Sequence, residues 1–198
     1  MPRRSQAERS RTTRTALIET ARALFAERGY AAVPADEIVR AAGVTRGALY
    51  HHFGDKQGLF RAVVEQLEEE ITAEVAATAR DASDPVAAGL AALSRFLQVC
   101  QRDEVVRISL TDAPAVLGWQ AWREIESRHG LGLITETLEG AAAADMLIPV
   151  PIPELAQLVL SACSEAALMI AHAEDTESAK TRAEQALGAV VAGLVRTT

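Results

Sequence analysis

The chain has 198 residues, enough to bury a core in one or two domains. Apolar residues make up 49% and charged residues 24%, with both signs interspersed, which excludes a chain that is disordered throughout. Aromatic residues reach only 4%, and alanine recurs in runs such as residues 141–144, so the composition favours helices over strands. We therefore expect an all-α protein.

The charge is divided unevenly along the chain. The formal net charge is −7, which taken alone argues against a nucleic-acid partner. Residues 1–61 nevertheless hold eleven lysines and arginines against six acidic residues, a net charge of +5, which leaves −12 for the remainder. This asymmetry predicts a small module for a polyanion joined to a larger acidic domain with another task.

Helical periodicity predicts four helices in the first 80 residues. The first carries Leu17 and Phe25 on its apolar face and ends at Gly29. Short helices fit residues 34–42 and 45–52, with Thr45 as the N-cap of the second. From residue 55 to about residue 80, apolar side chains stay on one face and predict a rod of roughly 38 Å. A rod of this length can join two domains.

The rest of the chain predicts a helical body. Helices fit residues 86–101, 118–140, 154–172 and 177–196, with a short segment at 104–110 and an extended connector at the prolines of 149–153. The apolar stretch 155–173 contains polar side chains that would be costly in lipid, so we expect a buried or interface helix and no membrane partner. The last two helices have apolar faces wide enough for a homodimer interface.

Residues 38–53 have the pattern of a helix-turn-helix. Small and apolar residues surround Gly43, where two short helices would cross. The exposed face of the second of these helices then carries Arg46, Gly47, Tyr50 and His51, the donors and small residues that a groove-reading helix needs. The next helix begins near Lys56, where free backbone N–H groups also favour an anion.

The match extends beyond this general pattern. The run from residue 21 to 30 (ARALFAERGY), the pair at 37–38 and the run from 41 to 56 (AAGVTRGALYHHFGDK) resemble the TetR/AcrR transcriptional regulators in order and spacing. The resemblance covers residues 11–64, about a third of the chain. It implies a dimeric, ligand-responsive DNA-binding protein, usually a repressor, with a head at 1–54 and an effector-binding and dimerisation body at 55–198.

The resemblance also implies roles for individual residues. Contacts to bases or phosphates of a double-stranded operator would come from Thr45, Arg46, Gly47, Tyr50, His51 and His52, and a further phosphate contact from Lys56. Two departures from the family pattern stand out. Pro34 and Ala35 replace hydroxyl residues at the second helix, which puts a phosphate contact there in doubt, and Gly58 is expected to weaken the start of the fourth helix.

Several head residues have alternative interpretations. Arg46 is alternatively a solvated surface residue, and Tyr50 is alternatively packed against the first helix. The N-terminal arginines, Arg3 and Arg4 among them, are either a solvated tail or an arm for the minor groove. Neighbouring His51 and His52 point about 100° apart on a helix, and no carboxylate or cysteine completes a metal site, so no metal is expected.

The body suggests an effector site made by three helices. Large or polar side chains that would converge there are Phe96, Cys100, Trp119, Trp122, Glu165 and Met169. Such a site favours a largely apolar small molecule with one or two polar or cationic features, Glu165 holding a positive group in a dry pocket. The alternatives are that the tryptophans belong to the core and that Glu165 forms a structural salt bridge.

The sequence lacks the motifs of an enzyme, and no cofactor is expected. It has no glycine-rich phosphate loop, nucleophile elbow or metalloprotease motif. Cys100 and Cys163 lie in separate apolar stretches, so neither a disulfide nor a zinc site is expected, and the charged N-terminus has no signal peptide. We expect a cytoplasmic protein. The alternatives to a ligand-responsive regulator are a body that senses a protein partner or thiol oxidation, and a binding protein whose head is vestigial.

Overall fold

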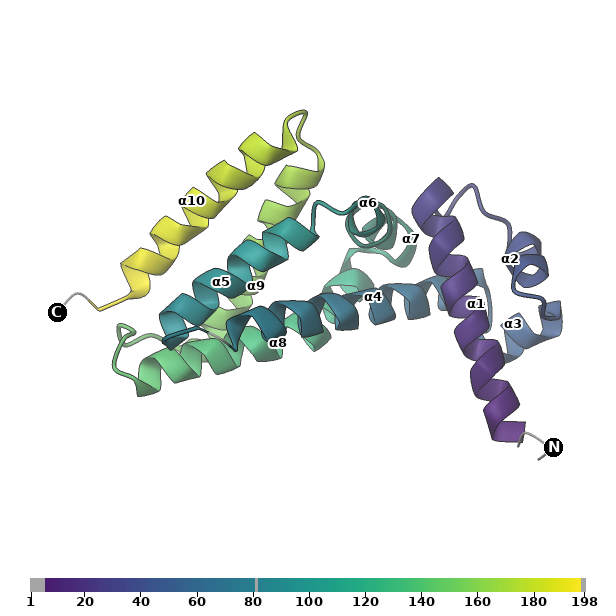
Figure 1. The fold of residues 1–198 in the computed structure, drawn as a ribbon, viewed down its shortest axis with the longest axis horizontal. Coiled ribbons are helices and arrows are strands. Elements are labelled where there is room, and N and C mark those ends of the chain that lie inside the picture. The colour runs from purple at the N-terminus through teal and green to yellow at the C-terminus, as the bar shows by residue number, and fades with distance from the viewer. Residues whose placement is uncertain (1–5, 81, 197–198) are drawn as a thin grey trace.

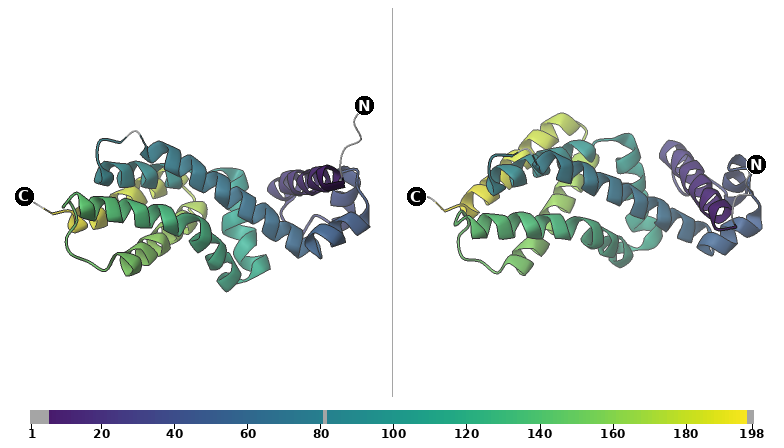
Figure 2. Two further views of the ribbon diagram at one scale, coloured as in Figure 1. Left: turned by 90° about the horizontal axis from the view of Figure 1, so that it is seen from below. Right: turned by 60° about the horizontal axis from the view of Figure 1, so that its bottom comes forward.

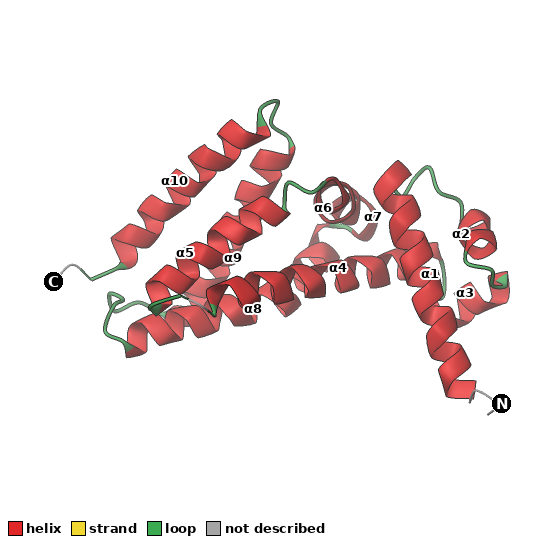
Figure 3. Cartoon of the chain, in the orientation of Figure 1, coloured by secondary structure: helices red, strands yellow, loops and turns green. Residues whose placement is uncertain are grey.

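The computed structural model describes residues 6–80 and 82–196, and these residues form helices and no strand (Figure 3). The predicted all-α fold is confirmed. The elements in chain order are α1 (Gln6–Arg28), α2 (Ala35–Ala41), α3 (Arg46–Phe53), α4 (Lys56–Ala79), α5 (Pro85–Val99), α6 (Asp103–Val105), the π-helix η1 (Val106–Asp112), α7 (Ala113–Leu117), α8 (Trp119–Ala143), α9 (Ile152–Ala171) and α10 (Thr176–Leu194).

The molecule is elongated, with α1 and α10 toward opposite ends (Figures 1 and 2). Helices α1–α3 form a small head at one end, and α5–α10 form the larger body at the other. Helix α4 runs from the head along the body and packs against α1 and α3 as well as α5 and α8. The predicted boundary after residue 54 falls in the turn before α4 and remains a prediction, because α4 contributes to both parts.

The head has a core of large side chains from its three helices and from the start of α4. Leu17 and Phe25 of α1, Ile38 of α2 and Leu49 of α3 are almost completely buried. Phe60 of α4 meets the Phe25 ring edge to face, with the ring centroids 5.3 Å apart. Burial of this kind outweighs the weak propensity of an isolated eight-residue helix such as α3.

Apolar residues along α4 continue this core into the body. Leu59, Val63, Leu67, Ile71 and Val75 are buried at the i, i+4 spacing that the sequence predicted. The same buried cluster includes Val99, Ile108, Trp122 and Ala167, from α5, η1, α8 and α9. Head and body therefore share one continuous hydrophobic core.

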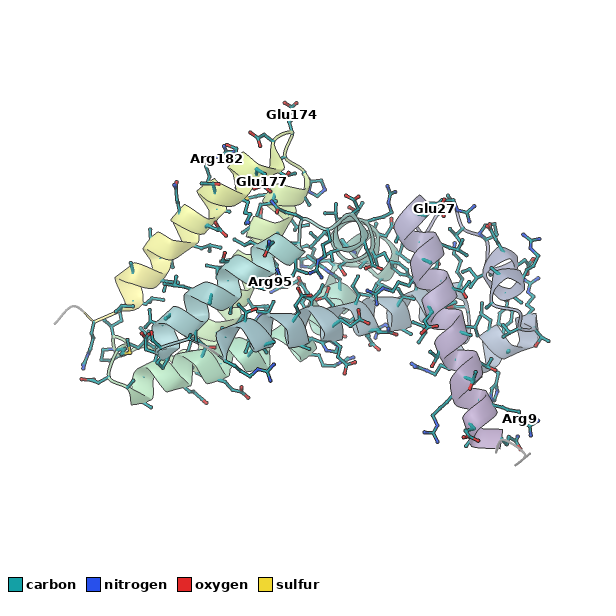
Figure 4. All side chains as sticks on the ribbon, in the orientation of Figure 1. Arg9, Glu27, Arg95, Glu174, Glu177 and Arg182 are labelled. Carbon is teal, nitrogen blue, oxygen red and sulfur yellow. The ribbon has the colours of Figure 1, made fainter. Side chains whose placement is uncertain are left out.

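The junction between head and body also contains polar contacts. The Asp112 carboxylate at the end of η1 accepts a hydrogen bond of 2.7 Å from the backbone N–H of Tyr30. Arg22 of α1 donates to Glu104 of α6 at 2.6 Å and to Glu70 of α4 at 2.6 Å. Along the body, the guanidinium groups of Arg95, which is labelled in Figure 4, and of Arg102 both reach the Glu74 carboxylate of α4.

The segment before Asp112 differs from the predicted short helix. Residues 103–117 form three consecutive helical pieces, and the middle one, η1, is a π-helix. π-helices are rare, occur mostly as single turns inside α-helices and are frequent at functional sites. Periodicity did not predict it, because seven residues are too few to distinguish a π-helix from an α-helix.

The last two helices close the body. Helix α9 packs against α8 and α10, and α10 also contacts α5. The chain after α10 is held by a bridge between Leu147 and Val195, with hydrogen bonds from Ile148 to Leu194 and from Arg196 to Met146 of 2.9 Å each. Among the described helices, α9 alone is long and apolar enough to span a membrane, but core helices pass the same test, and α9 packs within the bundle.

Candidate functional site

Helix α3 presents a polar face to solvent. Its N-terminus is capped as predicted, because the Thr45 hydroxyl accepts a hydrogen bond of 3.2 Å from the Ala48 N–H. Leu49 is buried against the head, whereas Arg46, Gly47, Tyr50 and His51 are exposed. The exposed face is therefore the predicted one, and it has the shape and the donors of a recognition helix.

Arg46 and Tyr50 lie together on this face. The Arg46 guanidinium donates to the Tyr50 hydroxyl at 3.3 Å, lies 5.7 Å from the centroid of the Tyr50 ring, and pairs with Asp36 of α2 at 3.3 Å. The hydrogen bond that Arg46 donates to the Tyr50 hydroxyl and the charge of Asp36 raise the pKa of Arg46. Tyr50 is 48% exposed, so it is not buried against α1, which was the alternative interpretation.

Lys56 begins α4, as predicted, and its side chain turns toward the end of α1. Its ammonium group donates to the Tyr30 carbonyl at 2.6 Å and sits 3.8 Å from the Tyr30 ring centroid. Burial lowers the pKa of Lys56, and the charge of Asp112 opposes that effect. In this structure Lys56 ties α4 to the end of α1, and its role toward DNA stays a prediction.

Gly58 has a steric role at the start of α4 that the sequence analysis did not predict. A Cβ atom at this position would lie 2.0 Å from the Phe53 carbonyl oxygen, so only glycine allows α3 and α4 to meet so closely. The Gly58 N–H donates to the Asp55 carboxylate at 2.7 Å, which caps α4. The tight turn fixes the angle between the recognition helix and the rod.

The other proposed DNA contacts lie near α3. His52 is half-buried, and its ring centroid is 5.1 Å from that of His51. Among the described residues no group of histidine, cysteine and acidic side chains has a metal-binding arrangement. Arg14 lies over the Phe53 ring, and Arg9 marks the outer end of α1 in Figure 4. Arg3 and Arg4 lie outside the described residues.

The six residues predicted for the effector site do not share one centre. Cys100 and Trp122 are buried in the core, and Phe96 is half-buried. Glu165 and Met169 are instead exposed on α9, so the expectation that Glu165 is buried is wrong. The reason is the orientation of α9, which buries Ala156, Leu160, Ala167 and Ile170 and turns Glu165 outward.

Two of the six residues line a groove between α8 and α9. The groove has a volume of about 520 Å³, and Trp119 and Glu165 contribute to it together with Arg123 and Ser161. Trp119 is 61% exposed and contacts Trp122, with ring centroids 4.8 Å apart. Trp122 is therefore a core residue, whereas the Trp119 side chain is accessible at the surface.

Two acidic side chains that the sequence analysis did not select contribute to the body. Glu126 of α8 is buried, and its carboxylate accepts from Arg123 at 2.7 Å and from Ser164 at 2.9 Å. Glu68 of α4 is half-buried; desolvation and the charge of Glu126 raise its pKa to about 7, and an interaction with Ser109 opposes this effect. Helical spacing could have indicated both positions, because Glu126 lies one turn after Trp122 and Glu68 lies one turn after buried Val64.

Both cysteines are free thiols in this region. Burial raises the pKa of Cys163 to about 11 and the pKa of Cys100 well above its usual value. Nearby acidic groups, Glu68 and Glu126, add to the effect at Cys100. Because the thiolate is the reactive form, both cysteines are poor nucleophiles at neutral pH.

The head carries an exposed recognition helix, and a long helix connects it to a helical body. This arrangement defines the class of helix-turn-helix regulators that carry a second, all-helical domain. Residues 17–63 match the bacterial regulatory proteins of the tetR family, and residues 86–194 match the tetracyclin repressor-like C-terminal domain. The second match covers more than half of the chain. The chain belongs to the TetR family of transcriptional regulators.

Individual proteins agree with this assignment. A TetR-family transcriptional regulator from Pectobacterium atrosepticum is 35% identical, with a TM-score of 0.87 over 98% of this chain and 99% of that one. The Transposon Tn10 TetC protein of Escherichia coli is 31% identical over 65% of each chain. RolR, solved in complex with resorcinol, is 20% identical with a TM-score of 0.73 over 91% and 90%, a likeness of fold.

The chain spans 65% of the TetC protein and about a third of the next curated relatives. TetR-family proteins are DNA-binding transcriptional regulators, typically repressors and dimers, and are not enzymes. This confirms the prediction that the chain is not an enzyme.

The position of Glu68 predicts how stability depends on pH. Its pKa is raised from 4.5 to about 7 in the folded state, so the stability that this shift provides is present below pH 4.5 and lost as the pH rises to 7 and above. Between pH 5 and pH 8 the free energy of unfolding of wild type should fall relative to Glu68→Gln by on the order of 2 kcal/mol. Urea unfolding at one protein concentration measures this difference.

The matched control is Glu69→Gln, which removes the same charge from the exposed neighbouring position. This variant should keep the wild-type pH dependence. If Glu68→Gln and Glu69→Gln behave alike, the interior position of the Glu68 carboxylate is wrong.

Proposed function

We propose that the protein is a ligand-responsive repressor that binds a double-stranded DNA operator as a homodimer and leaves it when a small molecule occupies the body. The observation that carries this proposal is the exposed Arg46 and Tyr50 pair on a helix whose following turn leads directly into α4, the helix shared with the body. In the cytoplasm, where we place the protein, operator and effector are both accessible.

The proposed DNA contacts follow from the chemistry of the exposed face. Arg46 reads a base edge or holds a phosphate, since its guanidinium has several donors, and Tyr50 gives its hydroxyl to a phosphate. Gly47 allows close approach of the backbone. Thr45, His51 and His52 flank this pair, and Lys56 adds a phosphate contact if it exchanges the Tyr30 carbonyl for DNA.

The proposed mechanism is a shift between two arrangements of the heads. A ligand that binds the body more tightly when the heads are wrongly spaced draws the dimer away from its operator. Helix α4 is the proposed connection, because it packs against elements of both parts. RolR, which has the same fold, is known in complex with resorcinol, and this supports a small-molecule ligand for the protein.

The two alternative sensing modes are less well supported. Thiol oxidation needs a reactive thiolate, but burial raises the pKa of both cysteines. A protein partner in place of a ligand would need a surface patch other than the one used for dimerisation. The exposed apolar side chains Leu158, Met169 and Val190 on α9 and α10 are instead assigned to the second copy of the chain.

The DNA-binding assignment predicts the effect of three substitutions. Arg46→Ala should weaken binding to a duplex selected by the wild-type protein by ~1–3 kcal/mol if Arg46 reads a guanine. Tyr50→Phe and Lys56→Ala should weaken binding to selected and unrelated duplexes alike, and the salt dependence should flatten by roughly one phosphate contact each. Fluorescence anisotropy at several salt concentrations gives these values.

The control is Arg128→Ala, which removes one positive charge from the body, where Arg128 pairs with Glu65. It should leave affinity for the selected duplex within about a factor of two. Unchanged affinity in all three head variants would remove the assignment of α3 as the DNA-reading element.

Dimerisation through α9 and α10 makes a separate prediction. Leu158 is 67% exposed on α9 and would be buried in a four-helix interface, so Leu158→Glu should convert a dimer at micromolar concentration into a monomer. Leu90→Glu, at a 41% exposed leucine on α5, should remain dimeric. Light scattering distinguishes the two states, and a monomeric wild type would refute the interface.

A further inference from the structure

An acidic side chain lies beside the start of the recognition helix. Asp36 is in the first turn of α2, and Arg46 is the first residue of α3. The two helices lie together at the outer end of the head (Figure 1), and the Asp36 carboxylate is 3.3 Å from the Arg46 guanidinium. The two side chains are 70% and 61% exposed, so both belong to the face that a bound duplex would cover.

The Arg46 guanidinium is held from two sides. One of its terminal nitrogens pairs with Asp36, and the other donates to the Tyr50 hydroxyl at 3.3 Å. The guanidinium carbon also lies 5.7 Å from the centroid of the Tyr50 ring. A guanidinium has more N–H donors than these contacts use, so donors remain for a base edge. The contacts restrict a long side chain that otherwise samples many rotamers.

The pair of Asp36 and Arg46 contributes little to folding. Exposed ion pairs are weak, because water and salt screen the charges and both side chains lose rotamer freedom when they pair. The stability of the head comes instead from buried side chains such as Leu17, Ile38 and Leu49. The consequence of the pair therefore concerns whatever approaches the exposed face.

The Asp36 charge has two opposite effects on DNA binding. A carboxylate repels the phosphates of every duplex, whatever the sequence, and its pairing with Arg46 also reduces the attraction of this arginine to phosphates. A guanine edge presents the acceptors O6 and N7, which a guanidinium of the right orientation meets with parallel N–H groups. Orientation before binding removes part of the entropic cost of that contact.

We propose that Asp36 is a positioning residue for sequence recognition: it holds Arg46 toward a guanine and disfavours phosphate contacts, so that discrimination between sequences rises while total affinity falls. This inference rests on the proposed function, because it assigns to Arg46 the reading of a base instead of a phosphate. Asp36 acts through Arg46 and needs no DNA contact of its own.

Duplexes selected from a random pool by the wild-type protein supply the test, with affinities from fluorescence anisotropy. Single base-pair changes in the selected duplex locate the position at which Arg46→Ala loses discrimination. At that position, Asp36→Asn should lower the preference for the selected base pair about fivefold. Its affinity for an unrelated duplex should rise about threefold, and the salt dependence should steepen by roughly one phosphate contact, because Arg46 is released to the backbone.

Two controls separate positioning from a general effect of charge. Glu27→Gln removes one negative charge from an exposed position at the end of α1 opposite Arg9 (Figure 4), and it should leave both affinities within about twofold of wild type. In an Arg46→Ala background, Asp36→Asn should no longer steepen the salt dependence, because the guanidinium that would reach the backbone is gone.

The proposal is overturned if Asp36→Asn keeps the wild-type preference, if Glu27→Gln lowers that preference as much, or if Asp36→Asn steepens the salt dependence equally with and without Arg46. An Arg46→Ala variant that discriminates like wild type at every position also overturns it, but leaves DNA binding by the head intact. A wild type that selects no duplex instead rejects the proposed function, and this inference with it.

Discussion

The packing of α4 is the constraint on which the rest of the structure depends. Its apolar stripe begins under the head at Leu59 and continues to Val75 in the body, and the side chains around it form one buried cluster with α1, α5, η1 and α8. A flexible linker would let the head move without disturbing the body. Here, any reorientation of α4 must repack apolar contacts at both ends, so the orientation of the recognition helix and the state of the body are energetically linked.

Hydrogen bonds at the junction also connect the head to the body. Tyr30 is held on both sides of its backbone, by Asp112 from η1 and by Lys56 from α4, while Gln57 reaches the Val116 carbonyl at 2.6 Å. η1 contacts the turn after α1 at Asp112, and its Ile108 is buried in the core that the head shares with the body. A change in this π-helix therefore acts on the head and on the core of the body at the same time.

Much of the head follows from local chemistry that the sequence displays. Thr45 and Asp55 are caps, Leu49 and Phe25 are core residues, and the period of α4 is regular enough to predict its buried face. Tertiary contacts decided the rest. The orientation of α9 exposed Glu165, the approach of the Phe53 carbonyl made Gly58 necessary, and the Tyr30 carbonyl drew Lys56 inward. Buried Ser109 and Glu126 went unrecognised because a polar residue beside an apolar stripe resembles a surface position until its neighbours are known.

Native-state hydrogen exchange at the Tyr30 amide tests most directly whether head and body form one cooperative unit. This N–H belongs to the head, but its acceptor, Asp112, belongs to the body. The account predicts that its opening free energy equals that of the α4 amides at Val63 and Leu67, in the shared core. Exchange of the Tyr30 amide at a much lower free energy than those α4 amides would show that the head opens on its own and would contradict the account.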